Sequence, residues 1–261
     1  MATGAAPGHA DRLLTHGDRR PRAVLMLHGY THSPAQLDVL AGLFFDRGYN
    51  VSVPRAPHHG VATPGAHAAV TVEGLLAYAG NALDLAATLG DEVGVIGVSG
   101  GAVLATWLAA HRGDTVSRLL ALAPLYAPHP GRIPPVLLRP LIRLYGLGLL
   151  PDRIDSRGYS YRAVARYLRI AADHPSRPRP GALRHVAVAV SAGDTVVDRR
   201  SAFDVPARLA AAAGATLVQD TLPAELGLGH NIVSPIGSAD DALARRYLAL
   251  YENTPLDLPP G

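Results

Sequence analysis

Ser99 lies in a short stretch whose glycine spacing is typical of a nucleophilic serine. Residues 97–101 read GVSGG and match the pattern G-x-S-x-G, in which a serine occupies a sharp turn between a strand and a helix. A side chain at Gly97 or Gly101 would collide with the neighbouring element, because the two backbones approach closely at such a turn. The turn would raise the Ser99 hydroxyl above the sheet and aim the Gly100 N–H at a developing oxyanion.

A serine hydroxyl is a poor nucleophile at neutral pH unless a base and an orienting carboxylate assist it. Among the 12 histidines, His230 is the leading candidate for the base, because it lies in a short glycine-flanked loop after the last expected strand. Asp194 is the leading candidate for the acid, because it follows the strand expected over 185–191. Asp198 is its rival, four residues further on. The chain order Ser99, Asp194, His230 is the order that accompanies the G-x-S-x-G turn.

An oxyanion hole needs a second N–H donor, which should come from the loop after the first strong strand. That loop begins His28-Gly29-Tyr30, and the Tyr30 N–H is the expected donor. The Tyr30 side chain is expected either to line an acyl pocket or to pack as an ordinary aromatic residue. His58 and His59 are expected to brace their loop, since adjacent histidines point in divergent directions and suit a metal poorly. No metal site is therefore predicted.

Short apolar runs alternate with amphipathic stretches along most of the chain. This alternation predicts an α/β fold with a mostly parallel, doubly wound sheet covered by helices on both faces. The carboxyl ends of parallel strands meet in one crevice, so Ser99, Asp194 and His230 should face it together. Strands are expected over 23–27, 49–54, 93–98, 119–123, 185–191 and 215–222, and helices over 35–46, 72–89, 102–112, 201–213 and 238–251.

The alternation breaks over residues 126–182, which we interpret as an inserted helical cap on a core formed by 1–125 and 183–261. Ten of the 22 prolines lie between Pro124 and Pro180, and helices are expected over 136–150 and 159–172. The first of these helices is apolar, and three roles stay open: packing on the core, walling an apolar substrate pocket, or contacting a lipid surface. The residues expected to line the substrate pocket are Gly29, Leu138, Ile142 and Val196.

The amino-acid composition excludes several kinds of catalytic chemistry and disfavours some partners. The chain of 261 residues has no cysteine and no lysine, which excludes disulfides, a cysteine nucleophile and a lysine Schiff base. Its net charge is +3 without a basic stripe, so nucleic acid is not an expected partner. No signal peptide or 18-residue apolar run is visible, which predicts a cytoplasmic protein without stable membrane insertion. The oligomeric state stays open.

Four motifs together resemble the α/β-hydrolase superfamily. The stretch from residue 27 to residue 60 is similar to bacterial carboxylesterases of the monoacylglycerol-lipase-like branch. The resemblance implies that Ser99 is the nucleophile, Asp194 the acid and His230 the base, with the N–H groups of Tyr30 and Gly100 forming the oxyanion hole. The motifs that carry it are Leu27-His28-Gly29-Tyr30, Gly97-Val98-Ser99-Gly100-Gly101, Gly193-Asp194-Thr195-Val196-Val197 and Gly229-His230.

The expected function is therefore a cofactor-free serine hydrolase that cleaves carboxylic esters through an acyl-enzyme. Its expected partner is a small-molecule ester with a short-to-medium acyl or monoacylglycerol-like group. Thioesters, lactones and amides remain alternatives, because they share the tetrahedral intermediate. A non-catalytic binding protein with the same fold is an alternative of another class. A dinucleotide-binding oxidoreductase is disfavoured, since the chain lacks G-x-G-x-x-G.

Overall fold

The computed structural model describes residues 6–63, 65–155, 158–173, 181–233 and 239–255. Its centre is a seven-stranded sheet with the order β1-β3-β2-β4-β5-β6-β7. All neighbouring strands are parallel except the edge pair β1 and β3. The strands are β1 Arg12–Leu14, β2 Arg20–Leu27, β3 Asn50–Val53, β4 Gly90–Val98, β5 Val116–Leu122, β6 His185–Ser191 and β7 Thr216–Leu222.

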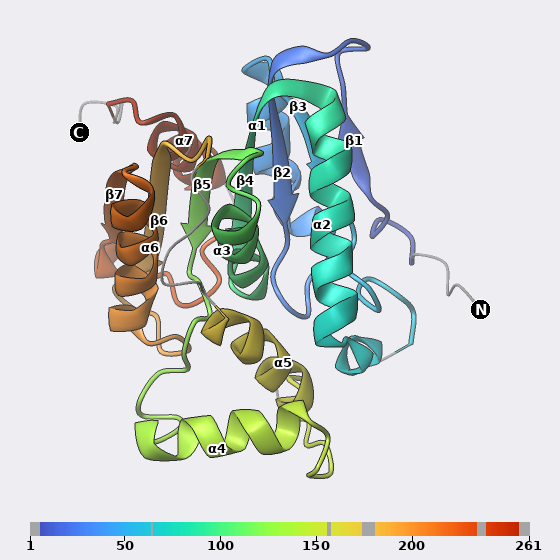
Figure 1. Cartoon of the computed structure of the whole chain (residues 1–261), viewed down its shortest axis with the longest axis vertical. Coiled ribbons are helices and arrows are strands. Elements are labelled where there is room, and N and C mark those ends of the chain that lie inside the picture. Colours follow the sequence, from blue (N-terminus) through green and yellow to red (C-terminus); the bar gives the residue numbers. More distant parts are fainter. Residues whose placement is uncertain (1–5, 64, 156–157, 174–180, 234–238, 256–261) are drawn as a thin grey trace.

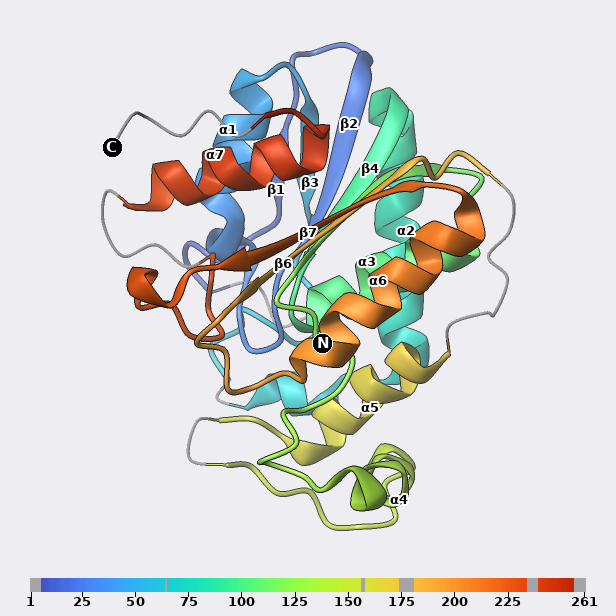
Figure 2. The same cartoon turned by 90° about the vertical axis from the view of Figure 1, so that its left-hand side faces the viewer.

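Helices cover both faces of this sheet (Figures 1 and 2), which confirms the predicted fold class. The α-helices are α1 Asp38–Asp46, α2 Val72–Leu89, α3 Gly100–His111, α4 Pro135–Gly146, α5 Tyr161–Ala172, α6 Arg199–Ala213 and α7 Ala239–Glu252. Short 3₁₀ helices are η1 Pro34–Leu37, η2 Ala66–Ala69 and η3 Ala224–Leu226. The residue at which the last helix was expected to begin, Ser238, lies outside the described residues.

Burial on both faces explains the continuous apolar runs of the central strands. In β2, Leu25 and Leu27 pack into a core with α2, α3 and α6, whereas Val24 and Met26 pack into a second core with α1 and α7. Parallel strands covered on both sides need apolar residues at every position, not at alternate positions. The two cores hold the sheet rigid, so the carboxyl ends of its strands form a fixed platform.

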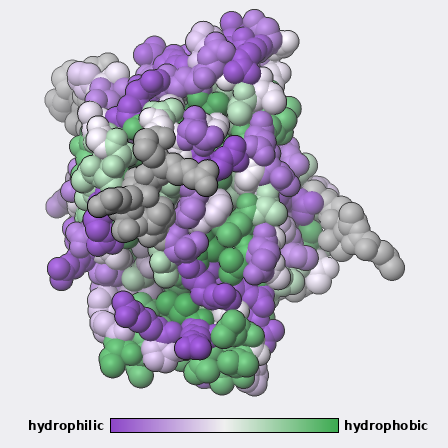
Figure 3. Space-filling model, viewed as in Figure 1, coloured by the Kyte–Doolittle hydropathy of each residue, from purple (hydrophilic) through white to green (hydrophobic). Residues whose placement is uncertain are grey.

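Helices α4 and α5 lie beyond the carboxyl ends of the strands (Figure 1). Helix α5 packs against α3 and α2, and its Ala163, Tyr167 and Leu168 are buried in the larger core. Helix α4 packs mainly on α5, and Gly146 is its one buried residue. Of the three roles left open for the first helix of this segment, packing on the core does not account for its most exposed apolar side chains, since Val136 is 80% and Leu137 50% exposed. Figure 3 shows hydrophobic side chains gathered at this end of the molecule.

Candidate active site

Ser99 connects β4 to α3 in a strained backbone conformation. Its φ of 53° and ψ of −110° lie outside the regions that residues other than glycine normally adopt. The neighbouring backbone holds it there: the Ser99 N–H donates to the Leu122 carbonyl at 2.8 Å, and its own carbonyl accepts the N–H of Ala102 at 3.1 Å. Strain of this kind persists only where the surroundings enforce it.

The glycines of the turn are required by close backbone approach, as the sequence predicts. A Cβ on Gly97 would overlap the backbone of Gly101 and Ala102. A Cβ on Gly101 would overlap the carbonyl groups of Leu27 and His28 at the end of β2. The Ser99 turn is thus pressed against the loop that follows β2.

The structure places His230 between Ser99 and Asp194. The Nε2 of His230 lies 2.9 Å from the Ser99 Oγ, and its Nδ1 lies 2.8 Å from the Oδ2 of Asp194. A carboxylate can only accept here, so Nδ1 carries the hydrogen and Nε2 is left to accept the proton of the Ser99 hydroxyl. The three residues come from loops after β4, β6 and β7, which all end at the same edge of the sheet.

Asp194 is held in its ionised form. Its side chain is fully buried, and its Oδ1 accepts the N–H groups of Val196 at 2.7 Å and Val197 at 3.2 Å. Burial by itself would raise the pKa of the Asp194 carboxyl, but the hydrogen bond and charge of His230, together with these two N–H groups, outweigh it and lower that pKa. A buried carboxylate therefore faces the histidine throughout the neutral range.

The rival acid, Asp198, has a different position. Its side chain caps α6 by accepting the N–H groups of Arg200 at 3.3 Å and Ser201 at 3.1 Å. This arrangement is an ordinary helix N-cap.

Tyr30 lies beside Gly100, the residue that follows Ser99. A Cβ built on Gly100 would lie 3.2 Å from the Tyr30 Cβ, so the two backbones are neighbours. Within the described part of the chain, neither the Tyr30 N–H nor the Gly100 N–H donates to another residue. Gly100 is also the first residue of α3, where the helix dipole favours negative charge.

The Tyr30 side chain is packed and does not line an open pocket. It is 3% exposed, and its ring contacts those of His67 and Tyr167 at centroid distances of 5.0 and 5.5 Å. Its hydroxyl accepts the N–H of Ser160 at 3.2 Å. The ring therefore ties the loop after β2 to the start of α5.

The four residues expected to line a substrate pocket are dispersed. Gly29 is buried and donates its N–H to the Oε1 of Gln36 at 2.7 Å. The Val196 N–H donates to the Oδ1 of Asp194. Leu138 and Ile142 lie partly buried between α4 and the larger core. None of the four lines the cavity described next, and their contact with substrate stays a prediction.

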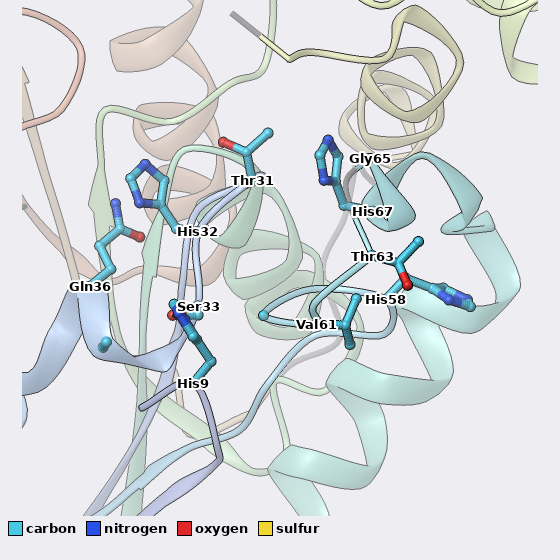
Figure 4. Close-up of a pocket in the computed structure, with 12 residues that line it drawn as sticks. His9, Thr31, His32, Ser33, Gln36, His58, Val61, Thr63, Gly65 and His67 are labelled. Atoms are coloured by element: carbon cyan, nitrogen blue, oxygen red, sulfur yellow. The ribbon is translucent and has the colours of Figure 1, made fainter. Parts of the chain in front are cut away.

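A polar cavity of about 470 Å³ lies between the loop after β2 and the loop after β3 (Figure 4). We call it the imidazole cavity, because four histidines line it. Sequence reasoning missed it, although the dense histidines and threonines of residues 31–67 were a signal. Its lining residues are His9, Thr31, His32, Ser33, Ala35, Gln36, His58, Gly60, Val61, Thr63, Gly65 and His67.

His28 and His59 lie outside the Ser99 group and have structural partners. His59 bonds the Pro57 carbonyl through Nδ1 at 2.8 Å, and His28 accepts the Ala56 N–H at 3.0 Å. No group of three histidine, aspartate or glutamate side chains among the described residues could hold a metal ion. Across the same residues, no helix is long and apolar enough to cross a membrane.

No protein-family model and no curated protein matches the chain. Its structure is similar to three solved structures of low sequence identity. One belongs to metagenome-derived lipolytic enzymes (20% identity, TM-score 0.71, covering 96% of this chain and 100% of that one). The second is a soluble variant of monoglyceride lipase from Saccharomyces cerevisiae in complex with a substrate analog (13%, 0.65, 94% and 91%). The third is the thioesterase domain from the curacin biosynthetic pathway (17%, 0.51, 91% and 98%).

These similarities, taken with the strand order and the turn at Ser99, show that the chain has the α/β-hydrolase fold. A fold hosts many activities, so the reaction has to be argued from the site itself.

Proposed function

We propose that the protein is a serine hydrolase that cleaves carboxylic esters through an acyl-enzyme. The observation that carries the proposal is the hydrogen-bonded series Asp194–His230–Ser99, which ends on a serine in a strained turn. A serine, a histidine and a carboxylate in this order of contacts form the arrangement that activates a hydroxyl for acyl transfer.

In the proposed reaction, the Ser99 Oγ attacks the ester carbonyl carbon while His230 Nε2 takes its proton. Asp194 stabilises the imidazolium that forms, and the N–H groups of Tyr30 and Gly100 bind the oxyanion. The tetrahedral intermediate collapses, and His230 returns the proton to the leaving alcohol oxygen. Water then attacks the acyl-enzyme with His230 again as base, which releases the acid and restores Ser99. The reaction needs no cofactor.

We propose a small-molecule ester with a short-to-medium acyl or monoacylglycerol-like group as the substrate. The segment 126–182 would act as a cap, because α4 and α5 lie beyond the strand ends that carry Ser99 (Figure 1). Support for the ester class comes from the similar solved structures, which include lipolytic enzymes and a monoglyceride lipase. Thioesters are the next substrates to test, since one neighbour is a thioesterase domain.

The test is hydrolysis of p-nitrophenyl esters from acetate to palmitate by the wild type and by Ser99→Ala and His230→Ala. We expect an optimum at intermediate chain length and a loss of about 10⁴-fold or more in kcat for both variants. A fluorophosphonate probe should label Ser99 in the wild type alone. A folded wild type without ester turnover would reject the ester hydrolase and direct the search to thioesters and amides.

A further inference from the structure

Eight of the twelve residues that line the imidazole cavity have side chains that form hydrogen bonds, and none of the twelve carries a fixed charge. Its twelve lining residues supply four imidazoles, three hydroxyls and one amide, while Ala35 and Val61 are the only apolar side chains. Neither an acid nor an arginine is among them. Ligand pockets in proteins are usually lined by apolar side chains with a few polar groups. This cavity has a larger share of polar groups than such pockets usually have, so it suits a polar ligand.

Several of these groups are open to a ligand. The Oε1 of Gln36 is held by the Gly29 N–H at 2.7 Å, which leaves the amide nitrogen to donate. Thr31, His32 and Thr63 bond through their side chains to no residue in the described part of the chain. Together they offer donors and acceptors, which matches hydroxyl groups because a hydroxyl does both. An anion would have to be buried without a cationic side chain, which is costly.

Two residues with a strained backbone line the same cavity. Five described residues other than glycine have a positive φ, and two of them, Thr31 at 71° and His58 at 63°, line the cavity. A third is Ser99. The left-handed region is especially unfavourable for a β-branched threonine. Strained residues gather where the fold holds a ligand or a reacting group in place.

His32 connects this cavity to the reacting groups. His32 lies two residues after Tyr30, whose N–H is the proposed oxyanion donor, and a Cβ built on Gly29 would lie 3.5 Å from the Cδ2 of His32. Burial lowers the pKa of the His32 imidazole, and the charge of His230 lowers it further. In the proposed reaction His230 delivers its proton to the leaving alcohol oxygen. The alcohol part of the ester therefore departs on the side of the site where His32 and the cavity lie.

We propose that the imidazole cavity binds the alcohol part of the substrate, and that this part is an uncharged, hydroxyl-rich group of sugar size. Its volume of about 470 Å³ falls in the range of small-molecule sites, roughly 300–1,000 Å³. The inference rests on the proposed function and deepens it, since it assigns the class of alcohol that is released. His32 and Thr63, on the two opposing loops, would contact the hydroxyl groups.

The experiment compares two esters of equal acyl length and similar alcohol size. One is methyl glucoside butanoylated on its primary hydroxyl, and the other is cyclohexylmethyl butanoate, which lacks the hydroxyls. We expect the wild type to favour the sugar ester at least tenfold in kcat/KM. His32→Phe and Thr63→Val should each lower this ratio about tenfold, because a site built around hydroxyls loses its preference when its polar partners are removed. Thr88→Val, at the far end of α2, should leave the ratio unchanged.

A binding measurement separates this inference from the proposed function. Saturation-transfer NMR with Ser99→Ala should detect methyl glucoside and not cyclohexylmethanol, whether or not esters turn over. Turnover of p-nitrophenyl butanoate without preference for the sugar ester, and without methyl glucoside binding, would overturn the cavity assignment alone. Binding of methyl glucoside without any ester turnover would support the cavity assignment and overturn the proposed hydrolase.

Discussion

The two carboxylate oxygens of Asp194 accept hydrogen bonds from different groups. Oδ2 receives the His230 Nδ1–H, while Oδ1 is held by the N–H groups of Val196 and Val197. The second set of bonds fixes the plane of the carboxylate, so that the first can fix the imidazole. Asp198 follows the same strand, but its oxygens cap α6. Sequence favoured Asp194 because it lies directly after β6, and the hydrogen bonds give the physical reason for preferring it.

This difference yields a prediction with a matched control. Asp194→Asn should lower kcat for an activated ester about 10⁴-fold, because an amide nitrogen facing His230 would favour the wrong tautomer. Asp198→Asn should leave kcat near the wild-type value, since asparagine caps a helix as well as aspartate does. Steady-state kinetics with p-nitrophenyl butanoate measures both. Equal losses in the two variants would contradict the assigned roles.

At the scale of elements, the turn from β4 into α3 depends on how closely it approaches β2. Gly90 illustrates a related requirement. Gly90 is the C-cap of α2, which ends at Leu89, and with its extended φ of −155° it also begins β4. A Cβ there would lie 2.6 Å from the Ala23 backbone nitrogen on β2. Glycine is needed at this position by a neighbouring strand and not by the helix end.

The effect of replacing a glycine by alanine on stability should therefore depend on which atoms lie next to the new Cβ. Gly97→Ala and Gly101→Ala should each lower the free energy of unfolding by about 1–3 kcal/mol or more, because the new methyl group meets backbone that has no room to move. Gly80→Ala in α2 should instead raise it by up to about 1 kcal/mol, since nothing lies within 4 Å of its Cβ. Urea unfolding of the three variants gives the comparison, and a stabilised Gly101→Ala would contradict the packing described.

Helices α4 and α5 should respond differently to the same substitution. Leu168→Ala on α5 should cost about 2–5 kcal/mol of unfolding free energy, because Leu168 is buried in the larger core. Leu137→Ala on α4 should change it by no more than about 0.5 kcal/mol, because Leu137 is half exposed. Chemical denaturation measures the pair. A large loss for Leu137→Ala would mean that α4 is covered in solution.

At the scale of the whole molecule, buried histidines make the folded state sensitive to acid. Burial lowers the pKa of His28 to about 3 and that of His59 to about 4, with smaller contributions from neighbouring histidines. Both are neutral in the folded protein at pH 5, whereas the unfolded chain would protonate them with a pKa near 6.5. The unfolded state thus binds more protons as pH falls, and folding is weakened.

Between pH 7 and pH 5, protonation of each of these two histidines in the unfolded state should lower the free energy of unfolding by about 2 kcal/mol. Urea unfolding at pH 7, 6 and 5 should show this decline. His59→Gln should make the decline smaller by about 2 kcal/mol, while His58→Asn, at an exposed position with positive φ that asparagine tolerates, should leave it unchanged. A stability that is constant or rises on acidification would refute the burial of these imidazoles as neutral groups.

The sequence by itself determined the fold class and the approximate positions of most of its elements. Apolar runs, amphipathic stretches and glycine turns are local signals, and they located β6 and α2 to the residue. They also predicted Ser99, Asp194 and His230, since position after a strand implies a place at one edge of the sheet. The structure brings these three side chains within hydrogen-bond distance, and their chemical roles stay predictions.

Only the tertiary structure decided which side chains share a surface. It packed the Tyr30 ring against α5, exposed Val136 and Leu137 of α4, and brought the loops after β2 and β3 together around the imidazole cavity. Residues 9, 32 and 63 are far apart in the chain, and no local pattern records that they meet. Local sequence sets the backbone of each element, whereas contacts between loops depend on strand order and on the close approach of distant segments.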